Sequence, residues 1–165
     1  MKSHTAFLLL GTNVGNRQLH LRHALKRIAG DTGSIVLISS TYETQPWGVT
    51  NQDDYLNMAV QLETRLSADD LFEKLREIEI SEGRTNAARN APRTLDIDIL
   101  FFDDLVLESE RLMIPHPRLQ LRRFVLEPLV EIAPAVIHPL LRKTVKELLE
   151  DCPDDKNVRR LQVNK

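Results

Sequence analysis

The chain has 165 residues, of which 42% are apolar and 28% charged, a balance typical of one folded domain rather than of a disordered or fibrous chain. Its 22 basic and 24 acidic residues leave a net charge of −2, so no overall positive field favours nucleic acid or an anionic membrane as a partner. We therefore expect a single domain over residues 1–165.

The early apolar run is too short to anchor the chain in a membrane. It extends from Ala6 to Leu10 and ends at Gly11, far below the ~18 residues of a membrane span. Cys152 is the one cysteine, which excludes an internal disulfide and any cysteine-based zinc site. The sequence therefore predicts a cytoplasmic protein.

Hydrophobic spacing predicts a regular succession of strands and helices. Strand patterns occur at residues 5–10, 35–44, 55–64 and 95–102, and helical repeats at residues 21–29 and 67–83. The resulting order, β-α-β-β-α-β, is that of a ferredoxin-like core with both helices packed on one side of the sheet. We therefore expect an α+β fold with a mainly antiparallel sheet.

The rest of the chain is expected to extend this core, which would span about residues 5–134. Residues 104–114 have the pattern of an added hairpin. Residues 118–132 and 144–149 predict a C-terminal helical extension, in which Pro128 cuts the first part into short turns. The polar tail after Cys152 is expected to be loose.

Asp96 and Asp98 are the sharpest candidates for chemistry. Their spacing directs both carboxylates to one face of a strand, and two like charges so close need a cation or a shared proton. Mg²⁺ meets that need, because one or two carboxylates bind it while phosphates and water complete its shell. The alternative is a half-exposed strand that carries two solvated aspartates.

Basic residues surround this acidic strand. Arg84, Arg89 and Arg93 precede it, and Arg111, His116, Arg118, Arg122 and Arg123 follow it. Guanidinium groups match phosphate oxygens, so the segment has the composition of a metal–nucleotide site. A surface network of ion pairs would give the same pattern.

The strand at 55–64 carries a second candidate. Tyr55 and Asn57 share its polar face, and together they offer a flat aromatic surface and an amide edge to a planar ligand. The Gly11–Gly15 segment is interpreted as a tight turn, with Asn16 as the cap of the next helix.

Several sequence blocks together resemble the 6-hydroxymethyl-7,8-dihydropterin pyrophosphokinase family. They are Gly11–Gly15, Tyr55–Asn57, Gly83–Arg84, Pro92–Leu100, Pro115–Arg118, and Arg122 with Phe124–Leu129, within a likeness that runs from about Ala6 to Pro134. The chain departs from the family at Asn90–Ala91, where an aromatic–Gly pair is common. The resemblance implies an ATP-dependent diphosphokinase of folate biosynthesis, which transfers pyrophosphate to a reduced hydroxymethylpterin and leaves AMP.

The resemblance also implies individual roles. Asp96 and Asp98 would bind two Mg²⁺ ions and would form the catalytic set with Arg84 and Arg93. The ATP site would be lined by Glu79, Arg84, Arg93, Ile99, Arg111, His116 and Arg122. The pterin would lie between Tyr55 and Phe124, with Asn57 and the segment around Thr44 and Trp47 at its edge. The partners would be these small molecules only, and the enzyme would act as a monomer.

Two other functions fit the same residues. A ferredoxin-like binding module would carry the aspartates on its surface and would not turn over a substrate. A two-metal phosphohydrolase would release phosphate from ATP without a pterin.

Overall fold

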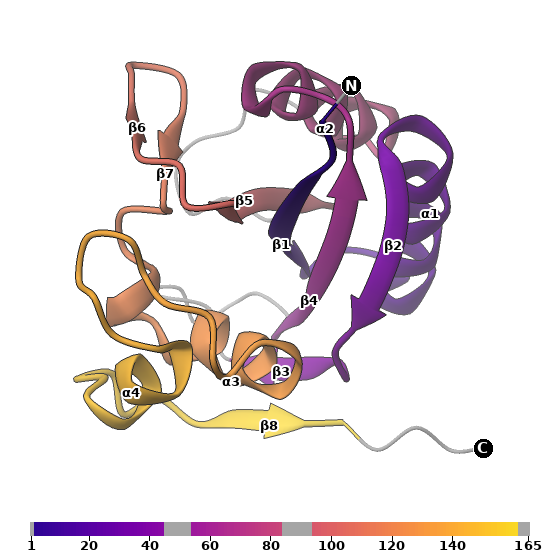
Figure 1. The fold of residues 1–165 in the computed structure, drawn as a ribbon. Coiled ribbons are helices and arrows are strands. Elements are labelled where there is room, and N and C mark those ends of the chain that lie inside the picture. Colours follow the sequence, from indigo (N-terminus) through magenta and orange to yellow (C-terminus); the bar gives the residue numbers. More distant parts are fainter. Residues whose placement is uncertain (1, 45–53, 84–93, 162–165) are drawn as a thin grey trace.

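The structure is a computed structural model, and it describes residues 2–44, 54–83 and 94–161. Figure 1 shows a sheet with helices on both faces. In chain order the elements are β1 (His4–Thr12), α1 (Arg17–Asp31), β2 (Gly33–Ile38), β3 (Tyr42–Thr44), β4 (Tyr55–Thr64), α2 (Ala68–Ser81), β5 (Asp96–Phe102), β6 (Leu107–Glu108), β7 (Met113–Ile114), the 3₁₀ turn η1 (Leu119–Leu121), α3 (Arg123–Ile132), α4 (Val145–Glu150) and β8 (Val158–Arg160).

The main sheet has the strand order β5-β1-β4-β3-β8, with β2 paired to β4 alongside β3. Each of its neighbouring pairs is antiparallel. The prediction of an α+β fold with an antiparallel sheet is confirmed. Within the described ranges, no helix is both long and apolar enough to cross a membrane.

Alternate residues of the central strand β1 serve two separate cores. Leu8 and Leu10 belong to the core beneath α1 and α2, whereas Phe7 and Leu9 belong to the core beneath α3 and α4. Because side chains alternate along a strand, one strand supports both layers. The sheet is therefore covered on its two faces by different parts of the chain.

The helix starts follow local sequence signals. The Asn16 side chain accepts a hydrogen bond from the Leu19 N–H at 3.1 Å, and the Ser67 hydroxyl oxygen accepts one from the Asp70 N–H at 3.1 Å. Each cap satisfies an N–H that the helix itself leaves unpaired. The predicted Asn16 cap is confirmed.

Two predicted strands differ from the structure in detail. The strand expected over residues 35–44 is divided into β2 and β3, because at the break the Ser39 hydroxyl accepts the Ala59 N–H that a backbone carbonyl would otherwise accept. In β5 the alternation breaks at Leu100, because Leu100 and Phe101 both face the α3 core and Phe102 faces the opposite core. A register shift in the β1–β5 pairing produces this change.

The C-terminal part also corrects two expectations. Helix α3 runs through Pro128, which is buried within it although a proline there leaves one backbone hydrogen bond of the helix unmade. The tail expected to be loose after Cys152 instead contains β8, which pairs with the edge strand β3. Asp154 contributes to this order, because its carboxylate accepts a hydrogen bond from the Arg123 N–H at 3.0 Å.

Candidate active site

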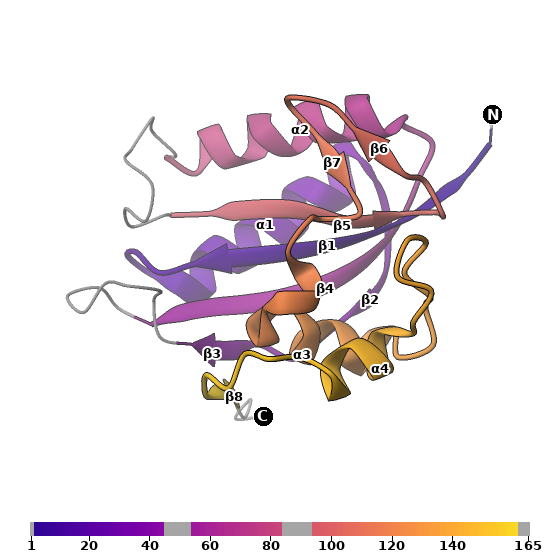
Figure 2. The same cartoon turned by 90° about the vertical axis from the view of Figure 1, so that its left-hand side faces the viewer.

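At one end of the sheet, on the left in Figure 2, lie the neighbouring ends of β5, β1, β4 and β3. There the register sets Asp96 and Asn57 on either side of Gly11 in a single row across β5, β1 and β4. Leu9 and Ala59 lie two positions further along these strands and pack in the core beneath α3. The side chains of the row therefore project to that same face of the sheet. Neighbouring strands lie about 4.8 Å apart, which puts Asp96 and Asn57 about 10 Å apart.

Asp98 extends this row along β5. It projects from the same face as Asp96, about 7 Å further along the strand, and it is exposed while Asp96 is half-buried. Asp98 is set opposite Leu9 in the β1–β5 register. The two carboxylates therefore emerge together at the rim of the sheet.

Asn57 and Thr44 each bury a polar atom for which the described part of the chain holds no hydrogen-bond partner. These atoms are Nδ2 of Asn57 and Oγ1 of Thr44, and both residues are only 3% exposed. Thr44 is opposite Tyr55 in the β3–β4 register, so the side chains of Thr44, Tyr55 and Asn57 share one face of the sheet. An unpaired buried donor costs about 1–3 kcal/mol, which a ligand with a matching acceptor would offset.

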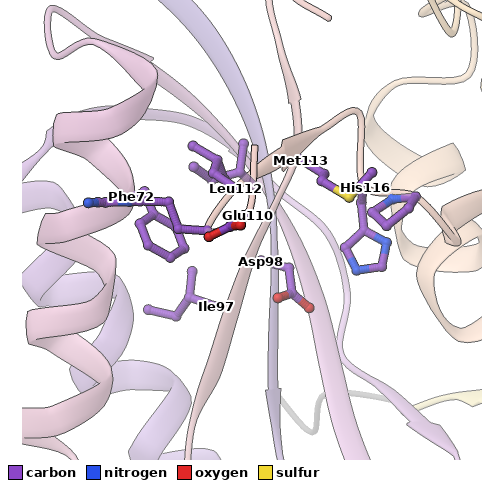
Figure 3. A pocket seen from close by; sticks show the side chains of 10 residues that line it. Phe72, Ile97, Asp98, Glu110, Leu112, Met113 and His116 are labelled. Carbon is purple, nitrogen blue, oxygen red and sulfur yellow. The ribbon is translucent and has the colours of Figure 1, made fainter. Parts of the chain in front are cut away.

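A cavity of about 250 Å³ opens beside Asp98. It brings together three predicted ATP-site residues, Ile99, Arg111 and His116, from β5 and the chain around β7. Figure 3 shows the rings of Phe72 and His116 on opposite sides of it. Apolar walls beside basic groups suit an aromatic base that carries phosphates.

His116 is held as a neutral imidazole at the cavity wall. Its backbone N–H donates to the Leu100 carbonyl at 3.1 Å, which fixes the residue beside β5. Burial, with the charges of Arg122 and Arg118, lowers the pKa of His116 to about 4. Its Nδ1 accepts from the Arg118 N–H at 3.3 Å, so the neutral ring carries its proton on Nε2 and can donate there.

Two predicted arginines lie over aromatic rings. The Arg111 guanidinium is 5.2 Å from the centre of the Phe72 ring and also pairs with Glu73. The Arg122 guanidinium is 5.7 Å from the centre of the Phe124 ring. Stacking orients a guanidinium without consuming its hydrogen-bond donors, and Arg122 thereby contacts a residue of the predicted pterin set.

Glu79 has a different setting from the other predicted ATP residues. Its side chain is 3% exposed, it does not line the cavity, and its Oε2 accepts the Ile97 N–H at 2.9 Å. Ile97 lies between the two aspartates on an edge strand, where an outward N–H has no strand partner. The Glu79 carboxylate therefore fixes the backbone that carries Asp96 and Asp98.

The structure also identifies residues that sequence reasoning missed. Phe72 and Leu112 line the cavity, and Gly11 separates Asp96 from Asn57. Phe72 had a usable signal, since it is a partly buried aromatic residue at the border of the apolar stripe of its helix. The predicted residues Trp47, Arg84 and Arg93 lie outside the described residues.

The two aspartates suit Mg²⁺ by the chemistry of their donors. Among the described residues no group of three or more His, Cys, Asp or Glu side chains is placed so as to hold a metal ion. Mg²⁺ keeps several waters and is commonly bound by one or two carboxylates with substrate phosphates. A carboxylate pair next to a basic cavity fits that requirement.

Comparison with known proteins gives concordant results. The sequence model of the family described as 7,8-dihydro-6-hydroxymethylpterin-pyrophosphokinase matches residues 7–134. A 2-amino-4-hydroxy-6-hydroxymethyldihydropteridine pyrophosphokinase of Aquifex aeolicus is 39% identical over 143 residues, which cover 87% of this chain and 89% of the relative. The enzyme of that name from Bacillus subtilis is 42% identical over 132 residues, 79% of each chain.

Solved structures show the same fold. Plasmodium falciparum HPPK-DHPS superimposes with a TM-score of 0.73 over 91% of this chain, at 20% sequence identity. The present chain spans 45% of that longer chain. From the family match over residues 7–134 and the identity to relatives of which 89% and 79% is covered, this chain belongs to the 7,8-dihydro-6-hydroxymethylpterin-pyrophosphokinase family.

Proposed function

We propose that the chain transfers pyrophosphate from ATP to the hydroxymethyl group of 6-hydroxymethyl-7,8-dihydropterin, in folate biosynthesis. The hydroxymethyl oxygen attacks the β-phosphorus of ATP, the bond from that phosphorus to the α,β-bridging oxygen breaks, and AMP leaves. The hydroxyl proton passes to solvent, and the product is the pterin diphosphate. The observation that carries this proposal is the row in which Asp96 and Asn57 share one face with only Gly11 between them.

At the pterin end, Asn57 donates through Nδ2 to the edge of the ring, and the Thr44 segment with Trp47 completes this edge. Tyr55 and Phe124 provide the aromatic faces against which the ring stacks. The buried Nδ2 of Asn57, which has no hydrogen-bond partner within the described part of the chain, supports this role. Binding here would fix the direction in which the hydroxymethyl group points.

At the ATP end, the cavity beside Asp98 receives the nucleotide. Ile99 contributes an apolar wall, while Arg111, Arg122 and the Nε2–H of His116 contribute donors to phosphate or ribose oxygens. Glu79 supports the site through the backbone of Ile97. Arg84 and Arg93 would balance charge on the departing AMP oxygen.

Asp96 and Asp98 would hold two Mg²⁺ ions, whose chemistry in phosphoryl transfer is to neutralise phosphate charge and orient the transferred group. This transfer depends on alignment and charge neutralisation more than on a strong base. Exclusion of water by the bound pterin favours transfer over hydrolysis.

The wider organisation is proposed on the same basis. The strand order β5-β1-β4-β2 with α1 and α2 on one face supports a ferredoxin-like core, to which α3 and α4 add a C-terminal helical extension. We further propose one domain over residues 1–165 that acts as a monomer in the cytoplasm. The two cores built on shared strands support a single domain.

The test is AMP formation from ATP, Mg²⁺ and 6-hydroxymethyl-7,8-dihydropterin, with each component omitted in turn. We expect AMP only when all three are present, together with an equal amount of pterin diphosphate. Phosphate release from ATP without pterin would identify a phosphohydrolase instead. Ligand binding without any product would identify a binding module.

A further inference from the structure

Gly11 lies at the centre of the row that joins the two halves of the proposed site. A Cβ atom at this position would lie 2.8 Å from Oδ1 of Asn57, closer than real side chains approach, whereas its other neighbours would be at ordinary contact distance of 3.9 Å. The Asn57 carboxamide therefore lies directly over the Gly11 backbone. It occupies the space that any other residue at position 11 would fill.

The backbone does not explain the glycine. Gly15, Gly33 and Gly83 have positive φ angles, but Gly11 is part of the extended strand β1 and has no such angle. Alanine can adopt this backbone conformation without strain. The contact with Asn57 is what distinguishes position 11.

We infer that Gly11 is a positioning residue for pterin recognition, because its missing side chain lets the Asn57 carboxamide lie against the backbone of β1. In that orientation Nδ2 is buried with no hydrogen-bond partner among the residues that the structure describes, and it is available to a ligand acceptor. This inference rests on the proposed function, since it assumes that Asn57 contacts the pterin.

The clash at position 11 has a predictable outcome. The atom that a new Cβ meets is at the end of a short side chain, so Asn57 can rotate away while the strands remain paired. The cost should therefore appear in ligand binding more than in stability. A rotated amide would leave its pterin hydrogen bond unmade, which corresponds to a loss of roughly tenfold to hundredfold in affinity.

The experiment uses the full chain in four forms: wild type, Gly11→Ala, Asn57→Ala and the double variant. Calorimetry measures binding of 6-hydroxymethyl-7,8-dihydropterin and, separately, of Mg²⁺ with a non-hydrolysable ATP analogue. Thermal melting reports stability. Gly30→Ala is the matched control, because Gly30 is an exposed helix position and a Cβ there would meet nothing within 4 Å.

We expect Gly11→Ala to weaken pterin binding by roughly tenfold or more and nucleotide binding by less than about threefold. In the Asn57→Ala background, the same substitution should change pterin affinity by less than about twofold, because the carboxamide it displaces is gone. Gly30→Ala should bind both ligands as the wild type does.

Two results would overturn the inference while leaving the proposed function intact. One is normal pterin binding by Gly11→Ala when Asn57→Ala binds weakly. The other is an equal loss from Gly11→Ala with and without Asn57, which would show that the effect does not pass through that side chain. Normal pterin binding by Asn57→Ala would instead contradict the role proposed for Asn57 itself.

Discussion

The two aspartates on β5 concentrate negative charge where the proposed reaction needs a cation. We predict that Asp96→Asn and Asp98→Asn each lower the rate of AMP formation by about 10²-fold or more. The change removes one charge and little volume, and both residues reach solvent at the rim of the sheet. Melting temperatures should therefore stay close to wild type.

Asp104 provides the control for this prediction. It is an exposed aspartate in the turn after β5, away from the Asp96–Asn57 row, and Asp104→Asn should retain full activity. Steady-state AMP release over a range of Mg²⁺ concentrations makes the comparison. Near-normal rates for Asp96→Asn or Asp98→Asn at saturating Mg²⁺ would disprove the metal-binding assignment.

His116 gives the site a measurable pH dependence of stability. The pKa of His116 is about 4 in the folded protein and about 6.5 in an unfolded chain. Between these values the unfolded chain binds a proton that the folded protein does not, so this residue makes the free energy of unfolding fall as the pH falls. Its contribution between pH 7 and pH 5 is a loss of about 2 kcal/mol.

We predict that His116→Gln reduces this pH dependence. Urea unfolding at pH 7, 6 and 5 should show a smaller loss of unfolding free energy in the variant than in the wild type. His138, whose pKa burial also lowers, is present in both proteins and cancels in the comparison. Parallel curves for the two proteins would show that His116 titrates normally in the folded state.

At the scale of elements, α3 depends on a cap from a distant part of the chain. Its N-cap residue, Arg122, makes no side-chain cap. Instead, the carboxylate of Asp154 accepts the first helical N–H, that of Arg123. The backbone carbonyl of Asp154 also accepts the Arg123 Nε–H, at 2.9 Å. A carboxylate there satisfies a free donor and complements the helix dipole.

We predict that Asp154→Ala lowers the free energy of unfolding by about 1 kcal/mol, within the range known for N-caps. Asp154→Asn should lose less, since its amide oxygen still accepts. Asp155→Ala is the matched control, because Asp155 is the exposed neighbour. Urea unfolding of the three variants decides the matter, and equal stability of Asp154→Ala and Asp155→Ala would refute the cap.

Local sequence signals were sufficient to predict most helices and strands. They were insufficient where contacts with residues distant in sequence determine the structure. The sequence shows the helix caps at Asn16 and Ser67 and the two-residue spacing that puts Tyr55 and Asn57 on one face. Each of these features depends on residues only a few positions apart. The pairing of β8 with β3 and the shift within β5 depend on strands remote in sequence. No periodicity in the chain reports those contacts.

In the candidate site, too, the sequence predicted the features that depend on nearby residues and not those that depend on strand pairing. Period-two spacing predicted that Asp96 and Asp98 share a face, and the structure agrees with that placement. The sequence spacing could not predict that Asp96 and Asn57 lie in one row, because that row depends on the register of both strands with β1. The function of Gly11 likewise becomes visible only when the neighbour across the strand is known.

For the whole molecule, the shared strands couple the two helical layers. The same central strands contribute to both cores, so detaching α3 and α4 would expose apolar side chains such as Phe7 and Phe101. Burial of a large apolar side chain is worth about 1.5–3 kcal/mol, and several would be lost together. The C-terminal layer should therefore not unfold before the sheet.

We predict that the chain unfolds in a single cooperative transition. Cys152, half-buried against the α3 core, is a natural probe of the C-terminal layer, while far-ultraviolet circular dichroism follows the secondary structure of the whole chain. Pulsed alkylation of Cys152 and the dichroism signal should then share one urea midpoint. Full reactivity of Cys152 at urea concentrations where the dichroism is still native would identify the C-terminal layer as a separate folding unit.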